Sequence, residues 1–455
     1  MRLLDPAAGA ALDSPYARHV NPQWVRVLEL LRMNEEYVRC EGALLHTRQG
    51  GRILDFLSGY CVHNVGHNHP RVVEAVRDEL EALGPAMLQS HVPERAGELA
   101  LRLCGRAGGR LSKVFFSSSG SESVEAAIKF ARAHTGRSGV LCAEGGFHGL
   151  TCGALSLMSN SFWRDGFGPL LQDTAAVPFG GLAALEARLA TRRYAAFVVE
   201  PIQAESGIRV PEPGYLQAAQ ALCRRHGSLF VLDEVQTGLC RTGAFLAAHH
   251  FGLDPDMVIL AKALSGGLVP SGALLMSDAV YRSVYSSLSR AFVHTSTYSE
   301  NGLAMRAGLA TLDVLAEERL DEAAARVGRH LRDRLKARLA PYEMVREIRG
   351  MGLLGGIEFA PPKRLDRRLI FEAFARMHPG LFGQILVMRL FRDEGILTQI
   401  CGNNFMVLKV APPLNVAPAQ IDEFVEAVGR VVEAMHTGTA FWSEALSLAQ
   451  RAVNI

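Results

Sequence analysis

Two charged side chains, each placed where an apolar run ends, carry the most chemical information in this sequence. Lys262 follows the run Met257–Ala261, and Asp233 lies 29 positions upstream, at the end of Leu229–Leu232. A lysine in apolar surroundings is poorly solvated as a cation, so its pKa falls and its amine becomes nucleophilic. An acid that can face a pyridinium nitrogen is the other half of a pyridoxal-phosphate site. Together the two residues predict a lysine that carries this cofactor as a Schiff base.

The elements around these two residues must bring them to one place. Phe197–Ile202 is an apolar run typical of a strand, and Gly214–Gly227 has a helical pattern that ends in basic residues and a glycine. The apolar run that ends at Asp233 follows. A strand, a helix and a strand at this spacing form a βαβ unit, so we expect a largely parallel sheet covered by helices. Such sheets bind ligands at the carboxyl ends of their strands, where Asp233 and Lys262 are expected.

A serine-rich segment, Ser119, Gly120 and Ser121, stands between the short apolar run Val114–Phe116 and a helical pattern. Free N–H groups and the dipole at a helix N-terminus stabilise a phosphate. These residues are therefore candidates for the phosphate end of the cofactor. The alternative is an ordinary N-cap with Glu122 in the first helical turn, and the segment alone does not separate the two.

The composition is that of a large enzyme without a strongly charged surface. The 455 residues include 48 basic and 46 acidic side chains, and the net charge of +2 offers no general attraction to nucleic acid or to an anionic membrane. No uncharged apolar run is long enough to span a bilayer. Asp5 and Pro6 interrupt the N-terminus, so we expect no secretion signal. The eight cysteines form no Cys-x-x-Cys pair, which favours reduced thiols and a cytoplasmic protein.

The last third of the chain changes character. From about residue 315, charged helical stretches alternate with short strands such as Leu353–Phe359 and Phe405–Val410, which is typical of a smaller α+β domain. The start of the chain lacks clear βαβ units and is expected to pack with that domain. We therefore predict an N-terminal segment at 1–55, a large cofactor-binding domain at 56–315 and a C-terminal small domain at 316–455.

A series of different short motifs extends along most of the chain, from about Ile53 to Leu414. They are Leu54–Gly59, Gly66–Pro70, Ser119–Glu122, Phe147–Gly149, Glu200–Gln203, Leu232–Gly238, Arg241–Gly243, Ala261–Leu264, His294–Thr297, Arg349–Gly352 and Pro412–Leu414. One such motif would be weak evidence for membership of a protein family, whereas the whole series in the order of one family is strong evidence. In this order they closely resemble the class III pyridoxal-phosphate-dependent aminotransferases of the ornithine, acetylornithine and putrescine type.

The resemblance implies a fold and an assembly. The family fold is α/β, fold type I of the PLP-dependent transferases. A large domain with a mostly parallel seven-stranded sheet is joined to a small α+β domain that both chain ends form. The family also takes a threonine from the partner subunit to the cofactor phosphate, and Thr297 matches it. The resemblance therefore implies a homodimer whose active sites are shared between subunits.

The resemblance also assigns roles around the cofactor, pyridoxal 5'-phosphate. Phe147 matches the aromatic residue that stacks on the ring, Val235 would press the opposite face, and Gln236 would hydrogen-bond the phenolic oxygen. His148 and Glu200 stand in matched motifs and complete the expected cofactor contacts.

Each assignment has a plainer alternative. Phe147 could be an ordinary core phenylalanine, and Lys262 could be a surface lysine at a strand end. Asp233 fits a helix N-cap or an ion-pair partner. With the resemblance, the cofactor roles are favoured.

The substrate side departs from the family pattern. Glu205 matches a glutamate that in ornithine-type enzymes pairs with an arginine before Pro-Pro-Leu, but the aligned residue here is Lys409. Lysine lacks the flat two-pronged fork of arginine, so we expect weaker or different carboxylate recognition. Glu300 is a second departure, because relatives usually carry two glycines before Asn301.

Three further residues are candidate pocket walls. Tyr60, Cys61 and Phe162 suggest an apolar or amine-only substrate arm, and the alternative is that all three are core residues.

These features predict ping-pong transamination between a primary amine, diamine or ω-amino acid and an aldehyde or keto acid. Lys262 would move a proton between the substrate carbon and the cofactor as general base and acid. The alternatives are a PLP-dependent decarboxylase, racemase or aminomutase on the same scaffold, or a cofactor-binding protein without catalysis. We expect no metal site, because the candidate histidines are widely separated in sequence; they are His67, His69, His148 and His294.

Overall fold

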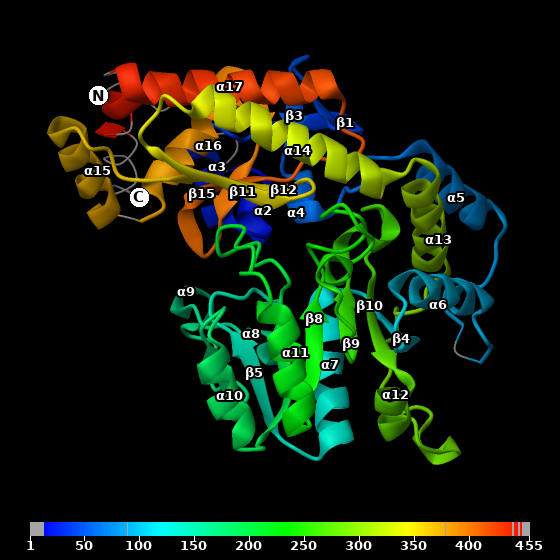
Figure 1. The fold of residues 1–455 in the computed structure, drawn as a ribbon. Coiled ribbons are helices and arrows are strands. Elements are labelled where there is room, and N and C mark those ends of the chain that lie inside the picture. The colour runs from blue at the N-terminus through cyan, green and yellow to red at the C-terminus, as the bar shows by residue number, and fades with distance from the viewer. Residues whose placement is uncertain (1–12, 89, 378, 439–440, 445, 448–455) are drawn as a thin grey trace.

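The computed structural model describes residues 13–88, 90–377, 379–438, 441–444 and 446–447 (Figure 1). Residues 1–12, on which the expectation about a secretion signal rests, lie outside these ranges. Within these ranges, no helix is both long enough and apolar enough to cross a membrane.

A seven-stranded sheet organises the larger part of the fold, in the lower half of Figure 1. Its strands, in spatial order, are β4 (Leu111–Ser117), β10 (Gly272–Ser277), β9 (Met257–Leu260), β8 (Leu229–Asp233), β7 (Tyr194–Val199), β5 (Gly139–Ala143) and β6 (Thr174–Val177). Every pair from β9 to β6 is parallel, and β10 runs antiparallel to its neighbours β9 and β4. The predicted mostly parallel, seven-stranded sheet is confirmed.

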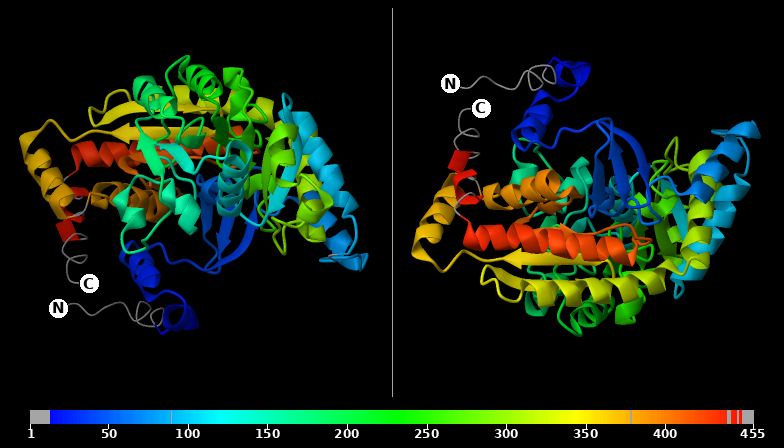
Figure 2. Two further views of the ribbon diagram at one scale, coloured as in Figure 1. Left: turned by 90° about the horizontal axis from the view of Figure 1, so that it is seen from below. Right: turned by 90° about the horizontal axis from the view of Figure 1, so that it is seen from above.

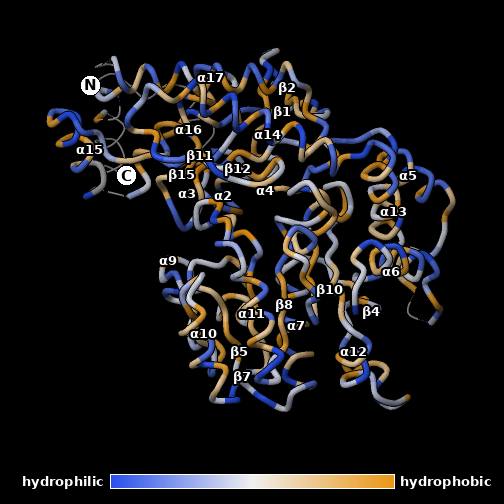
Figure 3. The backbone as a smooth tube through the Cα atoms, in the orientation of Figure 1, coloured by the Kyte–Doolittle hydropathy of each residue, from blue (hydrophilic) through white to orange (hydrophobic). Residues whose placement is uncertain are grey.

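Helices cover both faces of this sheet because its inner strands are apolar on both sides. Along β8, Leu229 and Val231 pack toward α7 (Gly120–Thr135), whereas Phe230 and Leu232 join the core on the other face. Figure 3 shows the resulting hydrophobic stretches along β5, β7 and β8. The other helices around the sheet are α5 (Pro70–Glu81), α6 (Glu94–Ala107), α8 (Cys152–Ser156), α9 (Ser161–Arg164), α10 (Leu182–Ala190), α11 (Tyr215–His226), η1 (Ala247–Phe251), η2 (Lys262–Ser265), α12 (Asp278–Val284), η3 (Leu288–Arg290) and α13 (Gly302–Glu317).

Segments from both ends of the chain build the smaller part. The N-terminal strands β1 (Tyr37–Glu41), β2 (Leu44–Thr47) and β3 (Arg52–Asp55) form a sheet that β13 (Ile396–Leu397) completes, parallel to β3. A second sheet, fully antiparallel, contains β11 (Val345–Met351), β12 (Leu354–Phe359), β15 (Asn404–Val410) and β14 (Gln399–Cys401).

Helices complete this smaller part. They are α2 (Pro15–His19), α3 (Pro22–Leu30), α14 (Leu320–Leu339), α15 (Leu365–Met377), α16 (Leu381–Glu394) and α17 (Pro418–Thr437). Figure 2 shows α14 in yellow beside α17 in red. The smaller part is therefore α+β and drawn from both chain ends, as expected, while the residue boundaries of the three predicted units stay a prediction.

A turn in the left-handed backbone conformation connects the two parts. In α4 (Ser58–Cys61) all four residues have positive φ, between 50° and 68°. Only glycine adopts this region without cost, and other residues lose roughly 1–2 kcal/mol each. Asp55 holds the turn in place, because its Oδ1 accepts hydrogen bonds from the backbone N–H groups of Leu57 and Ser58, both at 2.8 Å. The turn carries two of the predicted pocket residues, Tyr60 and Cys61.

Candidate active site

A cavity of about 420 Å³ opens where the central strands end. Its lining includes Ser118–Ser121, Phe147–Gly149, Glu200, Asp233, Val235, Gln236, Ala261, Lys262 and Gly267–Ser271. Asp233 is the last residue of β8, Glu200 follows β7, and Lys262 follows β9 by two positions. The expected convergence at the carboxyl ends of parallel strands is therefore confirmed.

Lys262 begins the short helix η2 with φ at +49° and lines the cavity, to which its side chain is partly exposed. Burial disfavours the ammonium form and lowers the pKa of Lys262, against the opposing charges of Asp233 and Glu205. A larger share of the amine is therefore neutral and nucleophilic than in an exposed lysine.

Three ionisable groups lie together behind the cavity. Asp233 is only 3% exposed; its Oδ2 lies 2.8 Å from His148 Nδ1, and its Oδ1 accepts a hydrogen bond from the Val235 N–H at 3.1 Å. Burial works against a charged imidazole, but the hydrogen bond and the charges of Asp233 and Glu200 outweigh it and raise the pKa of His148. Burial also raises the pKa of Glu200 to about 7, although His148 opposes it. His148 therefore holds Asp233 Oδ2 in one position behind the cavity.

The N-terminus of α7 forms another wall. Ser119 is its N-cap, because its Oγ accepts a hydrogen bond from the Glu122 N–H at 3.2 Å, so the plainer alternative is present as local structure. The first N–H groups of a helix lack partners within it and favour an anion nearby. A Cβ added at Gly120 would lie 3.1 Å from Val235 Cγ2, so only glycine leaves this space open. Ser271 adds a buried hydroxyl without a hydrogen-bond partner.

These residues fit pyridoxal phosphate. The cavity offers an amine for a carbonyl carbon, a buried acid for a ring nitrogen, and a helix N-terminus with a free hydroxyl for a phosphate. Phe147 and Val235 supply apolar surface for a flat ring, and Glu200 Oε1 anchors Phe147 by accepting its N–H at 2.9 Å.

The predicted substrate residues form a buried charged cluster. Lys409 is fully buried, and its Nζ donates hydrogen bonds to Glu205 Oε1 and, at 3.4 Å, to Gln236 Oε1. Gln236 Nε2 donates to the same Glu205 oxygen at 3.0 Å. Burial raises the pKa of Glu205, but the charge of Lys409 outweighs it and lowers that pKa overall. Lys409 Nζ also lies 5.0 Å from the centre of the Tyr60 ring.

The three candidate wall residues differ in exposure. Cys61 is buried, Tyr60 is 38% exposed and Phe162 is 65% exposed. None of the three lines the cavity of Lys262, and the alternative that all three are core residues fits Cys61 but neither Tyr60 nor Phe162.

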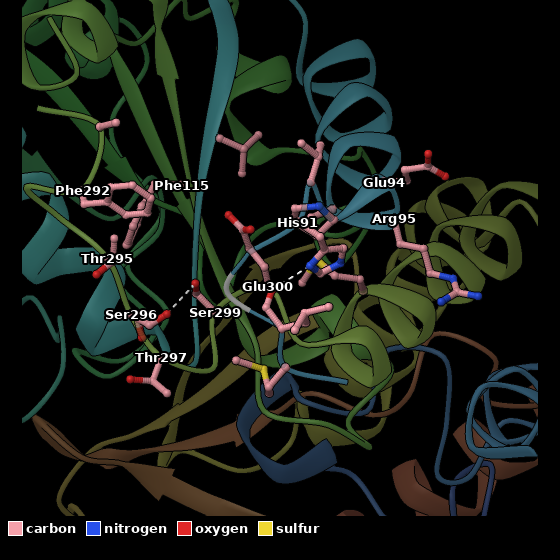
Figure 4. A pocket seen from close by; sticks show the side chains of 18 of the residues that line it. His91, Glu94, Arg95, Phe115, Phe292, Thr295, Ser296, Thr297, Ser299 and Glu300 are labelled. Atoms are coloured by element: carbon pink, nitrogen blue, oxygen red, sulfur yellow. Dashed lines mark hydrogen bonds between the residues drawn. The ribbon is translucent and has the colours of Figure 1, made fainter. Parts of the chain in front are cut away.

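Thr297 and Glu300 lie elsewhere, in a groove of about 1140 Å³ (Figure 4). Thr297 does not line the cavity of Lys262, and its predicted contact with the cofactor phosphate of a partner subunit stays a prediction. Burial raises the pKa of Glu300, although His91 opposes it. In Figure 4 the side chains of Glu300 and His91 lie near one another on the groove wall.

The four histidines weighed as metal ligands each contact a different group. His67 is hydrogen-bonded to Asp55, and His69 to Glu318. His148 is hydrogen-bonded to Asp233, and His294 to Lys129. In the part of the chain that the structure describes, no cluster of three or more His, Cys, Asp or Glu residues could hold a metal ion.

Some residues at or near the cavity are absent from the sequence-based predictions, among them Ser271, which lines it, and Trp163 and Asn403. Trp163 packs against Phe147, and Asn403 accepts a hydrogen bond from Trp163 Nε1 at 2.9 Å. Only the aromatic pair Phe162-Trp163 offered a local signal, because Asn403 lies 240 positions away in the sequence.

Comparisons with known proteins show the family to which the chain belongs. Residues 31–432 match the class III aminotransferase family. The aminotransferase PigE of Serratia sp. (strain ATCC 39006) is 36% identical over an alignment of 464 residues, gaps included. The alignment covers 95% of this chain and 54% of PigE. The chain thus spans about half the length of this curated relative.

Solved structures show the same fold. An (S)-enantioselective omega-transaminase from Thermomicrobium roseum is 30% identical with a TM-score of 0.82, over 95% of this chain and 100% of the other. The ornithine aminotransferase of Toxoplasma gondii is 30% identical with a TM-score of 0.79, over 88% and 91%. A PLP-bound amine transaminase from an uncultivated Pseudomonas species is 29% identical with a TM-score of 0.77, over 88% and 95%.

The chain therefore belongs to the class III aminotransferases, a family that depends on pyridoxal phosphate.

Proposed function

We propose that this protein is an aminotransferase that moves an amino group between a primary amine, diamine or ω-amino acid and an aldehyde or keto acid, by a ping-pong mechanism. The observation that carries the proposal is the single cavity in which Lys262, with its lowered pKa, shares the walls with the buried acid Asp233. When bound, pyridoxal phosphate supplies an electron sink for the bond to the proton of the amine-bearing carbon.

Lys262 has two roles in this proposal. Its Nζ would hold the cofactor, and as a free amine it would accept the proton from the substrate carbon and return it as general acid. The lowered pKa serves both roles, since only the neutral amine is a base or a nucleophile.

Asp233 would pair with the ring nitrogen of the cofactor and favour its protonated form. His148 positions Asp233 through its hydrogen bond to Oδ2, while Glu200 anchors the backbone of Phe147. Phe147 and Val235 would enclose the ring, Gln236 would contact the phenolic oxygen, and Ser119, Gly120 and Ser121 would hold the phosphate.

Glu205 and Lys409 would shape recognition of the substrate. Lys409 is paired and fully buried in the structure, so a substrate carboxylate gains a cation there only by displacing Glu205. Breaking the buried pair costs free energy, so we expect recognition of a substrate carboxylate to be weaker than, or different from, that by an arginine.

A homodimer with shared active sites is part of the proposal. The groove of Figure 4 carries Thr297 and has exposed apolar side chains along it, with Leu288 98% and Phe292 79% exposed. Contiguous exposed apolar surface is typical of an interface. We also propose a cytoplasmic location, which the eight free cysteines support.

The other reactions weighed on this scaffold are not favoured. The decarboxylase, racemase and aminomutase alternatives have no support from the relatives, which are aminotransferases by name. The intact Lys262 and Asp233 argue against a protein without catalysis.

An amine panel tests the proposed function. Protein saturated with pyridoxal phosphate is mixed with a diamine, an ω-amino acid, an α-amino acid and an alkylamine, without an acceptor. We expect at least one amine to convert the visible absorbance of the bound cofactor to that of pyridoxamine phosphate. Release of carbon dioxide from the amino acids would instead identify a decarboxylase, and no change with any amine would refute the proposal.

A further inference from the structure

An aromatic pair on α9 lies beside the cavity and has no part in the mechanism above. The Trp163 ring packs edge-on against Phe147, with the ring centres 5.4 Å apart. Phe162 packs edge-on against Trp163 at 4.9 Å and leaves most of its ring exposed. An aromatic surface therefore continues outward from the side chain proposed to stack on the cofactor.

Hydrogen bonds from two parts of the chain fix the Trp163 ring. Asn403 Oδ1 accepts from Trp163 Nε1 and from Asn160 Nδ2, each at 2.9 Å. Asn403 Nδ2 in turn donates to the Gly145 carbonyl at 2.9 Å. A half-buried amide that makes three hydrogen bonds holds a neighbouring ring in one orientation.

The same turn connects Trp163 to the buried charges. The Gly402 N–H donates to Glu205 Oε2 at 2.9 Å, and a Cβ added at Gly402 would lie 3.3 Å from both that oxygen and Trp163 Cζ2. Trp163 therefore lies against the backbone that satisfies one Glu205 oxygen, while Lys409 satisfies the other beneath Tyr60.

This wall offers a substrate an aromatic surface, and the cation beside Tyr60, Lys409, is already paired with Glu205. The described segments that build it are 58–61, 160–164 and 402–409, and their two cations are Arg164 and Lys409. Lys409 is paired with Glu205, and Arg164 Nη1 donates to the Met158 carbonyl at 3.1 Å. A carboxylate placed beside Tyr60 would lose water and find Lys409 already paired, whereas an alkyl or aryl arm would gain apolar burial. Arg164 keeps its charge, and its Nη1 is directed to the Met158 carbonyl.

We propose that Tyr60, Phe162 and Trp163 form a subsite for an uncharged, apolar arm of the amine or aldehyde, and that Trp163 is its specificity-determining residue. This inference rests on the proposed function and names the class of substrate for it.

A matched series of amines tests the subsite in the cofactor-loaded protein. n-Butylamine, n-hexylamine and n-octylamine are compared with 8-aminooctanoate, and kcat/KM is taken from the conversion of the cofactor absorbance. We expect each added methylene to raise kcat/KM about threefold to fourfold, the value for full burial. We expect n-octylamine to exceed 8-aminooctanoate by roughly tenfold or more.

Variants assign that selectivity to the aromatic wall. Trp163→Ala and Phe162→Ala should each reduce the gain per methylene, and Phe162 is exposed enough that its truncation leaves the fold intact. Trp24→Phe, a change at an exposed tryptophan outside this wall, should leave the gain as in the wild type. A gain per methylene that is absent from the wild type, or unchanged in both alanine variants, would overturn the inference.

A binding measurement separates this inference from the proposed function. In cofactor-free protein, n-octylamine should change the tryptophan emission with saturation, and Trp163→Phe should abolish the change. No emission change in the wild type, or the same change in Trp163→Phe, overturns the subsite. If no amine alters the cofactor spectrum, the proposed function fails, while the emission change still decides whether an apolar chain binds.

Discussion

Removal of the buried cation at position 409 is predicted to destabilise the fold. The Lys409 side chain is 0% exposed and that of Glu205 is 9% exposed. Lys409→Met would leave Glu205 buried with the Gly402 N–H and Gln236 Nε2 as its remaining donors. Loss of one partner of a buried ion pair costs about 3–5 kcal/mol. Because two donors stay, we expect the lower end, about 3 kcal/mol at neutral pH.

The dependence of this effect on pH follows from Glu205. In the wild type Lys409 lowers the pKa of Glu205 below 4.5, so the pair stabilises the fold above that pH and the stabilisation is lost as the pH falls through the lowered pKa. In Lys409→Met, burial acts without this opposition and the pKa of Glu205 rises. The folded variant then binds a proton more readily than the unfolded chain, so its deficit shrinks as the pH falls from 8 toward 4.5.

Urea unfolding of wild type, Lys409→Met, Glu205→Gln and the double variant at pH 8 and pH 5 measures these terms. We expect the double variant to lie within about 1 kcal/mol of the wild type, because no unpaired charge stays buried. Arg48→Met, which breaks an exposed ion pair with Glu36, is the matched control and should not move the urea midpoint. A Lys409→Met protein as stable as the wild type at pH 8, or a deficit that does not shrink at pH 5, would refute the reasoning.

Three further substitutions test the cofactor site. Lys262→Ala should abolish the visible absorbance of the lysine-bound cofactor in a protein that still folds, and an unchanged band would remove Lys262 from its proposed role. Asp233→Asn should lower turnover roughly a hundredfold or more, because the ring nitrogen loses its charged partner; near-normal kcat would contradict this. Gly120→Val should weaken pyridoxal-phosphate binding by about tenfold or more, since Val235 already lies within contact of an added Cβ; equilibrium dialysis that shows wild-type affinity would be the contrary result.

The parts of the site that follow one another along the sequence were predictable. The runs that end at Asp233 and before Lys262 are local patterns, and a parallel sheet brings such ends together whatever the rest of the chain does. The structure places Phe147, Val235 and Gln236 on the same cavity, where the family resemblance expected them. Their roles toward the cofactor are still predictions.

The polar contacts between distant segments were not predictable. Arg241 belongs to a matched motif, yet nothing in the motif shows that the side chain is 0% exposed and bonds Asn64 and the carbonyls of Leu353 and Pro412. Such a network depends on which surfaces meet after folding. The left-handed turn at Ser58–Cys61 could not be predicted either, because three of its four residues are types that rarely adopt positive φ.

The pairing of β3 with β13 has a consequence during synthesis on the ribosome. Strand β3 is made early, but its parallel neighbour Ile396–Leu397 follows only about 340 residues later. At roughly 5–20 residues per second, β3 therefore waits about 20 to 70 seconds with one edge unpaired. An unpaired strand edge is a template for association with other chains, so the nascent N-terminal strands are where chaperone protection would matter most.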